Sequence, residues 1–155
     1  GHVCARGARC AADYQARISG PLLDRIDLRI DVPAGTAADL IRPQTGETSE
    51  TVRARVVEAR RMQAERYTAL GFPPETNNAQ CSSALVEPVA APDEGGSRLL
   101  SDAAEKMKFS ARAYHRILKV ARTLADLDGS DQVRRIHLAE AISYRVAGER
   151  MPAAA

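Results

Sequence analysis

Residues 110–129 of this chain read SARAYHRILKVARTLADLDG, and this stretch has the periodicity of an amphipathic helix. Ser110 is a good N-cap, and Asp128-Gly129 predict the C-terminal end of the helix. Between these ends, apolar residues recur at the helical spacing of three and four, namely Ala113, Ile117, Val120, Ala121, Leu124 and Leu127. The opposite face is basic and carries Arg112, His115, Arg116, Lys119 and Arg122.

Helical patterns continue on both sides of this stretch. From Ser97 onward an apolar side is formed by Leu99, Leu100, Ala103, Ala104 and Met107, and the pattern breaks at Lys108-Phe109. A last helix, from about Arg135 to Val146, is expected to bury Ile136, Leu138, Ala141 and Ile142. The region from Ser97 to Val146 therefore predicts a three-helix bundle, and the fold class is mostly α.

A further long helix is expected between Thr48 and Tyr67. Thr48 or Ser49 can cap it, and Gly71 with Pro73-Pro74 ends it. Its apolar stripe is narrow and runs along a charged rod, through Val52, Val56, Ala59, Gln63 and Tyr67. The following stretch, residues 75–96, is rich in proline and contains a Gly-Gly pair. This composition predicts a linker with one short helical turn.

Residues 20–33 read GPLLDRIDLRIDVP and predict a short helix followed by a strand. Ser19 and Pro21 favour a helix start. Residues 26–32 alternate apolar and charged side chains, which is the pattern of a half-buried strand, and Pro33 ends it. Arg25 falls at the junction between the two elements. Since a lone strand cannot satisfy its own backbone groups, we expect its partners to lie outside this chain.

The composition limits the classes of function that the chain can have. It has 155 residues and a net charge of +2, which is too balanced for binding nucleic acid through bulk charge. It has no apolar run long enough to cross a membrane and no leader pattern, so we expect a cytoplasmic protein with no membrane partner. The spacing from Cys4 to Cys10 lacks the second pair of an ordinary zinc site, and we therefore predict no metal.

The sequence lacks the motifs of a self-sufficient catalyst. It contains no G-x-x-x-x-G-K-[ST] loop and no apolar run that ends in paired acids. It also shows no Ser/His/Asp or Cys/His arrangement at recognisable spacing, because His115 and His137 lie on predicted helices away from acidic or thiol motifs. We expect no ATPase activity from this chain alone.

Three segments of the sequence, in this order, resemble the C-terminal part of the magnesium-chelatase-like AAA+ ATPases of the ComM/YifB family. They are YQARISGPLLDRIDL at residues 14–28, NAQ at residues 78–80 and SARAYHRILKVART at residues 110–123. The resemblance implies three parts: residues 1–33 as the end of the AAA+ core with the last strand, residues 34–96 as linker and inserted helix, and residues 97–150 as the helical lid.

The resemblance also implies functional roles. Arg25 falls on the arginine-finger position and Arg112 on the sensor-2 position, so both are candidate catalytic residues. Arg112 and Arg116 are the candidate nucleotide-binding residues, with Arg122 as a further fallback. ATP and Mg²⁺ are implied for the full-length protein only. Its implied partners are neighbouring subunits of a hexameric homo-oligomeric ring, and DNA on which the ring drives branch migration.

Several alternatives stay open. Arg25 could instead pair with Asp24 or Asp27, and the basic face of residues 110–129 could simply be solvated. The arginines of the helix from Thr48 to Tyr67 could touch DNA or another subunit, or only face water. The chain could also belong to a magnesium chelatase motor subunit, or be a free-standing helical adaptor that binds protein or DNA.

Overall fold

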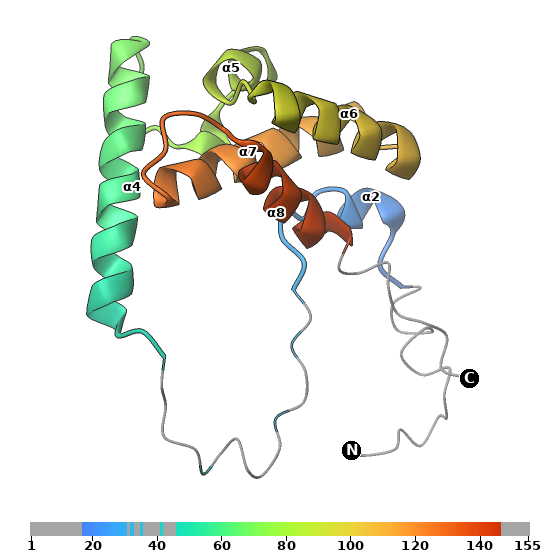
Figure 1. The fold of residues 1–155 in the computed structure, drawn as a ribbon, viewed down its shortest axis with the longest axis horizontal. Helices are drawn as coiled ribbons and strands as arrows, with labels where there is room; N and C mark the ends of the chain where they lie inside the picture. The colour runs from blue at the N-terminus through green and yellow to red at the C-terminus, as the bar shows by residue number, and fades with distance from the viewer. Residues whose placement is uncertain (1–16, 31, 33–34, 36–40, 42–45, 147–155) are drawn as a thin grey trace. The chain divides into compact units, whose positions relative to one another are not determined.

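Helices account for most of the residues described in the computed structural model, which are 17–30, 32, 35, 41 and 46–146 (Figure 1). The mostly α fold class is confirmed. The chain divides into two units, one made of Gly1–Gln44 with Tyr144–Ala155 and the other of Thr45–Ser143. The structure thus places helix α4 in the same unit as α5, α6 and α7. None of the helices among the described residues is long and apolar enough to cross a bilayer.

Helix α7 (Ala111–Leu127) is the central element of the second unit. The Ser110 hydroxyl oxygen accepts a hydrogen bond from the Ala113 N–H at 3.1 Å, which confirms the predicted N-cap. Asp128 is the C-cap, and Gly129 follows with a φ of 65°, a conformation that glycine adopts without steric cost. Helix α7 packs against α4, α5 and the short 3-10 helix η1.

The core of this unit lies around α7 and is built from small and medium apolar side chains. Ala113, Ile117 and Ala121 of the predicted apolar face are buried, and Val120 and Leu124 are partly buried against the core. The buried cluster also includes side chains from the other elements, among them Tyr67, Cys81, Val86, Ala90, Leu100, Val133, Leu138 and Ala141. The prediction for Ile136 is wrong, because this side chain is 58% exposed.

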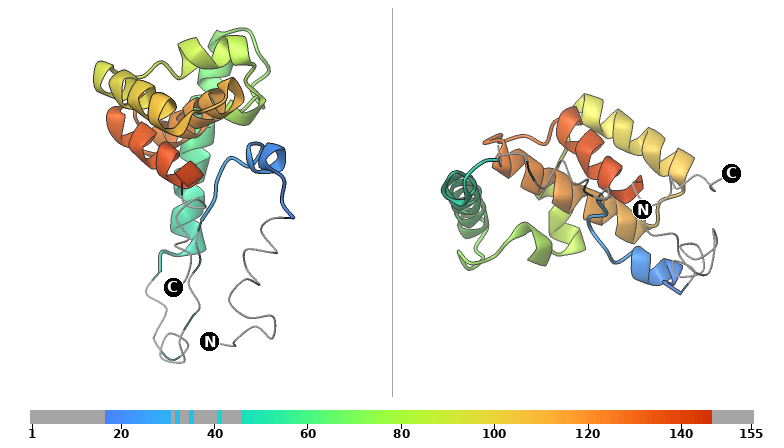
Figure 2. Two further views of the ribbon diagram at one scale, coloured as in Figure 1. Left: turned by 90° about the vertical axis from the view of Figure 1, so that its right-hand side faces the viewer. Right: turned by 90° about the horizontal axis from the view of Figure 1, so that it is seen from below.

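The predicted bundle is completed by α6 (Glu94–Met107) and α8 (Arg135–Val146), which lie side by side in the views of Figure 2. A Cβ atom on Gly96 would lie 2.8 Å from Leu138 Cδ1, so glycine permits the close approach of the two helices. This packing, together with the Asp93 cap of the Gly96 N–H, explains why the Gly-Gly pair lies inside a helix.

The prediction that residues 75–96 form a linker with one helical turn is wrong in its extent. This region holds η1 (Asn78–Gln80), α5 (Ser83–Val89) and the first turn of α6. The prolines do not prevent these elements. Pro88 lies in the last turn of α5, and Pro92 lies between α5 and α6 in an isolated bridge with Val133.

Helix α4 (Ser49–Ala69) confirms the long helix predicted from Thr48. The Thr48 hydroxyl oxygen accepts a hydrogen bond from the Thr51 N–H at 3.2 Å. Only the C-terminal half of the predicted apolar stripe is buried, through Ala59, Gln63 and Tyr67. Val52 and Val56 are 37% and 44% exposed, because no other described element covers the N-terminal turns.

The first unit contains α2 (Gly20–Leu23), the short helix predicted before Arg25. The strand predicted over residues 26–32 is not formed by its described residues, 26–30 and 32, which have no ladder partner. The apolar side chains that would line its buried face are exposed, from 39% at Ile26 to 86% at Val32. The alternating pattern is correct for a strand, but a strand needs a neighbour for its backbone hydrogen bonds.

Candidate functional site

Arg25 lies directly after α2, at a junction whose backbone is held by local hydrogen bonds. The Ser19 hydroxyl caps the start of α2 by accepting from the Leu22 N–H at 3.4 Å. Asp24 is the C-cap, and its N–H donates to Gly20 O at 2.9 Å. The N–H of Arg25 itself donates to Leu22 O at 3.0 Å. The position of the Arg25 Cα is therefore fixed by the short helix.

The side chain of Arg25 is exposed and forms no hydrogen bond or ion pair with the residues that the structure describes. The alternative pairing with Asp24 or Asp27 is not formed. The Asp24 carboxylate instead binds Arg145, with Oδ1 2.7 Å from Nη2. An arginine always carries its charge, so this guanidinium is available to a phosphate or carboxylate outside the described residues.

Arg112 lies in the first turn of α7, where the Ser110 cap leaves backbone N–H groups near the positive end of the helix dipole. Its side chain is exposed and has no polar partner in the part of the chain that the structure describes. Arg116 follows one turn later on the same side of the helix, half-buried and with an interaction of its own. Arg112 and Arg116 belong to the second unit, and Arg25 belongs to the first.

The remaining basic residues of the predicted face have partners within the protein. Lys119 donates from Nζ to Ala79 O at 2.9 Å, and His115 lies 3.6 Å from Glu87. Arg122 is 2% exposed, so placing it on an exposed basic face is wrong. Arg122 is also a fallback candidate for contact with the nucleotide phosphates. Its buried guanidinium already binds Asp126 and two backbone carbonyl oxygens, so we exclude it from this role.

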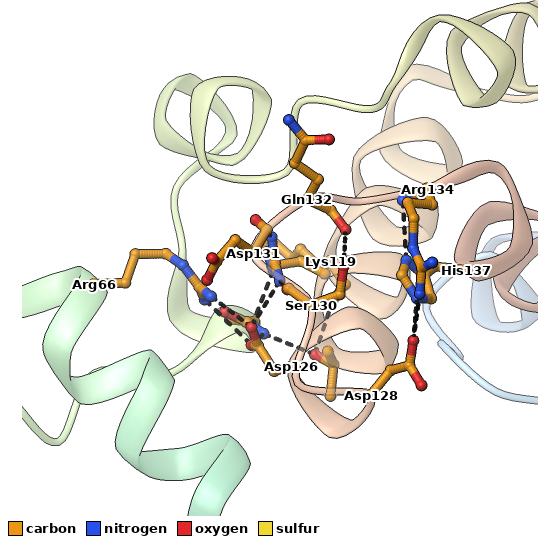
Figure 3. Close-up of polar contacts among 12 residues, drawn as sticks. Arg66, Lys119, Asp126, Asp128, Ser130, Asp131, Gln132, Arg134 and His137 are labelled. Atoms are coloured by element: carbon orange, nitrogen blue, oxygen red, sulfur yellow. Dashed lines mark hydrogen bonds and ion pairs between the residues drawn. The ribbon is translucent and has the colours of Figure 1, made fainter.

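Asp126 is the hub of a buried polar network at the end of α7 (Figure 3). Its side chain is fully buried and accepts from Arg66 Nη2 at 2.5 Å, from Arg122 Nε at 3.1 Å and from Asn78 Nδ2 at 2.8 Å. Burial lowers the pKa of Arg122, and the Asp126 charge opposes that shift. The network joins α4, η1 and α7 and satisfies every oxygen of the carboxylate, which is a structural role.

The segment NAQ at residues 78–80 contributes Asn78 to this network. Asn77 and Gln80 form a capping box around η1. Asn78 is buried, accepts from the Tyr67 hydroxyl at 3.0 Å and donates to Thr123 Oγ1 and to Asp126. Burial raises the pKa of Tyr67, so its hydroxyl stays a donor. Asn78 therefore fixes the connection between α4 and α7.

His137 caps the start of α8 and is the second cluster drawn in Figure 3. Its Nδ1 accepts from the Arg134 N–H at 3.0 Å, so the ring proton lies on Nε2, which is 3.3 Å from Asp128 Oδ2. The hydrogen bond from His137 lowers the pKa of Asp128. Both ring nitrogens of His137 thus have partners next to the start of α8, which is the arrangement of a helix cap.

Sequence reasoning missed three residues of these clusters: Arg66, Asp126 and Arg145. The i, i+4 spacing of Arg122 and Asp126 was a usable signal, because an acid on the apolar side of a helix needs a buried partner. Nothing in the sequence pairs Arg145 with Asp24, which is 121 positions away. Cys4 and Cys10 lie outside the described residues, among which no group of three or more acidic, His or Cys side chains could hold a metal ion.

Comparison with known proteins gives two family matches. Residues 46–145 match the model of magnesium chelatase, subunit ChlI C-terminal, and residues 1–40 match the model of magnesium chelatase, subunit ChlI. The competence protein ComM of Haemophilus influenzae is 42% identical over 133 residues, which cover 85% of this chain and 25% of that protein. The protein YifB of Escherichia coli is 37% identical over 152 residues, which cover 94% of this chain and 28% of that protein. The chain thus spans about a quarter of the length of these relatives.

Proposed function

Because this chain belongs to the family of magnesium chelatase subunit ChlI, we propose that it is the C-terminal part of an AAA+ ATPase of the ComM type. In the full-length protein it supplies two cations to ATP hydrolysis: Arg25 as the arginine finger and Arg112 as the sensor-2 arginine. Arg116 is the second nucleotide-binding residue of the proposal.

The observation that carries the proposal is the state of Arg25. The backbone of Arg25 is held by α2, and the carboxylate of the neighbouring Asp24 binds Arg145. The charged side chain of Arg25 is exposed and has no partner among the described residues. An arginine finger needs these properties, because it must reach a γ-phosphate bound by a neighbouring subunit and stabilise charge that develops in the transition state. A merely structural arginine would be expected to use its own chain as partner.

Arg112 supports the proposal independently. It lies in the first turn of a capped helix, where backbone N–H groups and the dipole already favour an anion. A guanidinium in this place adds a fixed fork of donors that matches phosphate oxygens. Lys119, His115 and Arg122 have partners inside the protein, and of the two remaining members of the face Arg112 is the more exposed.

ATP and Mg²⁺ belong to the proposal for the full-length protein. The sequence has no phosphate-binding loop, and the described residues contain no cluster of three or more His, Cys, Asp or Glu side chains that could hold a metal ion. In this proposal, Arg25 and Arg112 act on a nucleotide that is bound, with its Mg²⁺, by another part of the full-length protein. Following the ComM resemblance, we further propose hexameric rings that act on DNA in branch migration.

The test is the Arg25→Ala variant of the full-length protein. We expect ATP hydrolysis to fall by about 10³-fold or more, with the dissociation constant for ATP nearly unchanged, because a finger acts on the transition state. Arg98→Ala is the matched control, since Arg98 is an exposed arginine whose ion-pair partner among the described residues is the exposed Glu94, and its turnover should equal that of the parent. Unchanged turnover in Arg25→Ala would refute the assignment of Arg25 as the arginine finger.

A rival within the same family is a motor subunit that powers magnesium insertion into a porphyrin. The two functions differ in what stimulates hydrolysis. We expect branched DNA to raise the ATPase rate of the full-length protein. A rate that responds to the other chelatase subunits and a porphyrin, and not to DNA, would favour the chelatase instead.

A further inference from the structure

We propose that Arg145, near the C-terminal end of α8, is the positioning residue for Arg25. Arg145 binds the backbone carbonyl groups of the residues before and after Arg25, and it also binds the carboxylate of Asp24. This inference rests on the proposed role of Arg25 as an arginine finger. Asp24, Ile26, Tyr144 and Arg145 all belong to the same compact unit.

The guanidinium of Arg145 binds the chain on both sides of Arg25. Its Nη1 donates to Ile26 O at 3.2 Å, and its Nη2 donates to Asp24 O at 3.3 Å and to Asp24 Oδ1 at 2.7 Å. One side chain therefore fixes the carbonyl groups before and after residue 25. A second connection runs nearby, where the Arg29 N–H donates to Tyr144 O at 3.0 Å.

Burial makes this arrangement selective for arginine. The Arg145 side chain is only 6% exposed, whereas Asp24 is 31% exposed. Three acceptors around one guanidinium match its planar fork of donors. A lysine has a compact charge on a flexible stem and cannot reach the two carbonyl oxygens and the carboxylate with the same geometry.

The pair with Arg145 also removes a competitor. Asp24 is the residue next to Arg25, and a free carboxylate there would be a near partner for the finger guanidinium. Arg145 occupies this carboxylate through a short charge-assisted hydrogen bond. Arg25 is thereby left without an intramolecular partner among the described residues, and its backbone is fixed at the same time.

The test uses the full-length protein and measures kcat, KM for ATP, equilibrium ATP binding and thermal stability. For Arg145→Gln we expect kcat to fall on the order of 10- to 100-fold, because misplacing a catalytic group by about 1 Å has an effect of this size. KM and ATP binding should stay within about twofold of the parent, since the finger acts in the transition state. Arg145→Lys should lie between the parent and Arg145→Gln in kcat.

A double variant separates positioning from a structural role. Adding Asp24→Asn to Arg145→Gln removes the freed carboxylate, and we expect kcat to recover by about twofold to fivefold, the range of a partly exposed ion pair. A purely structural pair would give no recovery. Arg98→Gln, which breaks the exposed pair with Glu94, is the matched control and should keep the parent kcat.

Three outcomes would overturn the inference, and they are distinguishable. Parent-like kcat in Arg145→Gln, together with an inactive Arg25→Ala, removes the positioning role and keeps the proposed function. A joint loss of stability, ATP binding and kcat in Arg145→Gln, without recovery in the double variant, shows a structural role only. Full activity of Arg25→Ala refutes the proposed function itself, and the role of Arg145 with it.

Discussion

The substitution Asp126→Ala is expected to remove a large share of the stability of the unit formed by Thr45–Ser143. The Asp126 side chain is fully buried and accepts hydrogen bonds from Arg66, Arg122 and Asn78. Arg122 has a side-chain exposure of only 3% and cannot turn to water, so the change leaves a buried charge without its counter-ion. Breaking a buried pair in this way costs about 3 to 5 kcal/mol.

The neighbouring arginine provides an internal comparison. Arg66 has a side-chain exposure of 19%, and in Arg66→Met the Asp126 carboxylate keeps its bonds from Arg122 and Asn78. Arg66→Met removes the two hydrogen bonds that the partly exposed guanidinium donates to Asp126, and we expect it to cost about 1.5 to 3 kcal/mol, the range for hydrogen bonding to a charged group. Glu94→Ala, which removes an exposed ion pair, should leave the stability nearly unchanged.

The assay is urea unfolding of this chain, followed by circular dichroism, with the slope m compared between variants. In a parallel thermal unfolding experiment, a loss of 3 kcal/mol should lower Tm by roughly 12 °C or more for a unit of the size of Thr45–Ser143. The reasoning is refuted if Asp126→Ala unfolds within about 1 kcal/mol of the parent, or if Arg66→Met is the more damaging of the two.

Three further outcomes are expected. In the full-length protein, Arg112→Ala should lower both turnover and the affinity for ATP, and a variant equal to the parent in both would remove its sensor role. Gly96→Ala should destabilise the chain in thermal unfolding by about 1 to 3 kcal/mol, because the new Cβ would lie 2.8 Å from Leu138 Cδ1 of α8. Gly95→Ala, whose Cβ would make only ordinary van der Waals contacts, should be neutral or stabilising. The pKa of Asp128 is lowered by its hydrogen bond from His137, so this pair stabilises the fold above the ordinary carboxyl value of 3.8, and the contribution is lost as the pH falls through the folded-state pKa. His137→Gln should move the Asp128 titration, followed by NMR, back toward 3.8, and a carboxyl that titrates unchanged would contradict the assignment.

The helices of this protein could be predicted from its sequence because their signals are local. The caps at Thr48 and Ser110 and the stop at Gly129 act through backbone groups within a few residues, and the spacing of apolar side chains marks the buried face. The alternating pattern after Ile26 was equally clear, but a strand depends on a ladder partner, and none of the described residues provides one.

The state of each arginine was decided by the tertiary structure. Arg112 and Arg122 share a predicted helix face, yet Arg112 is exposed while Arg122 is buried on Asp126 and the carbonyl groups of the following loop. The partners that matter are far apart in sequence, 60 positions for Arg66 with Asp126 and 121 for Arg145 with Asp24. Local periodicity says which side of a helix a charge occupies, whereas only the packing of distant segments decides which acid reaches it and which guanidinium is left for a ligand.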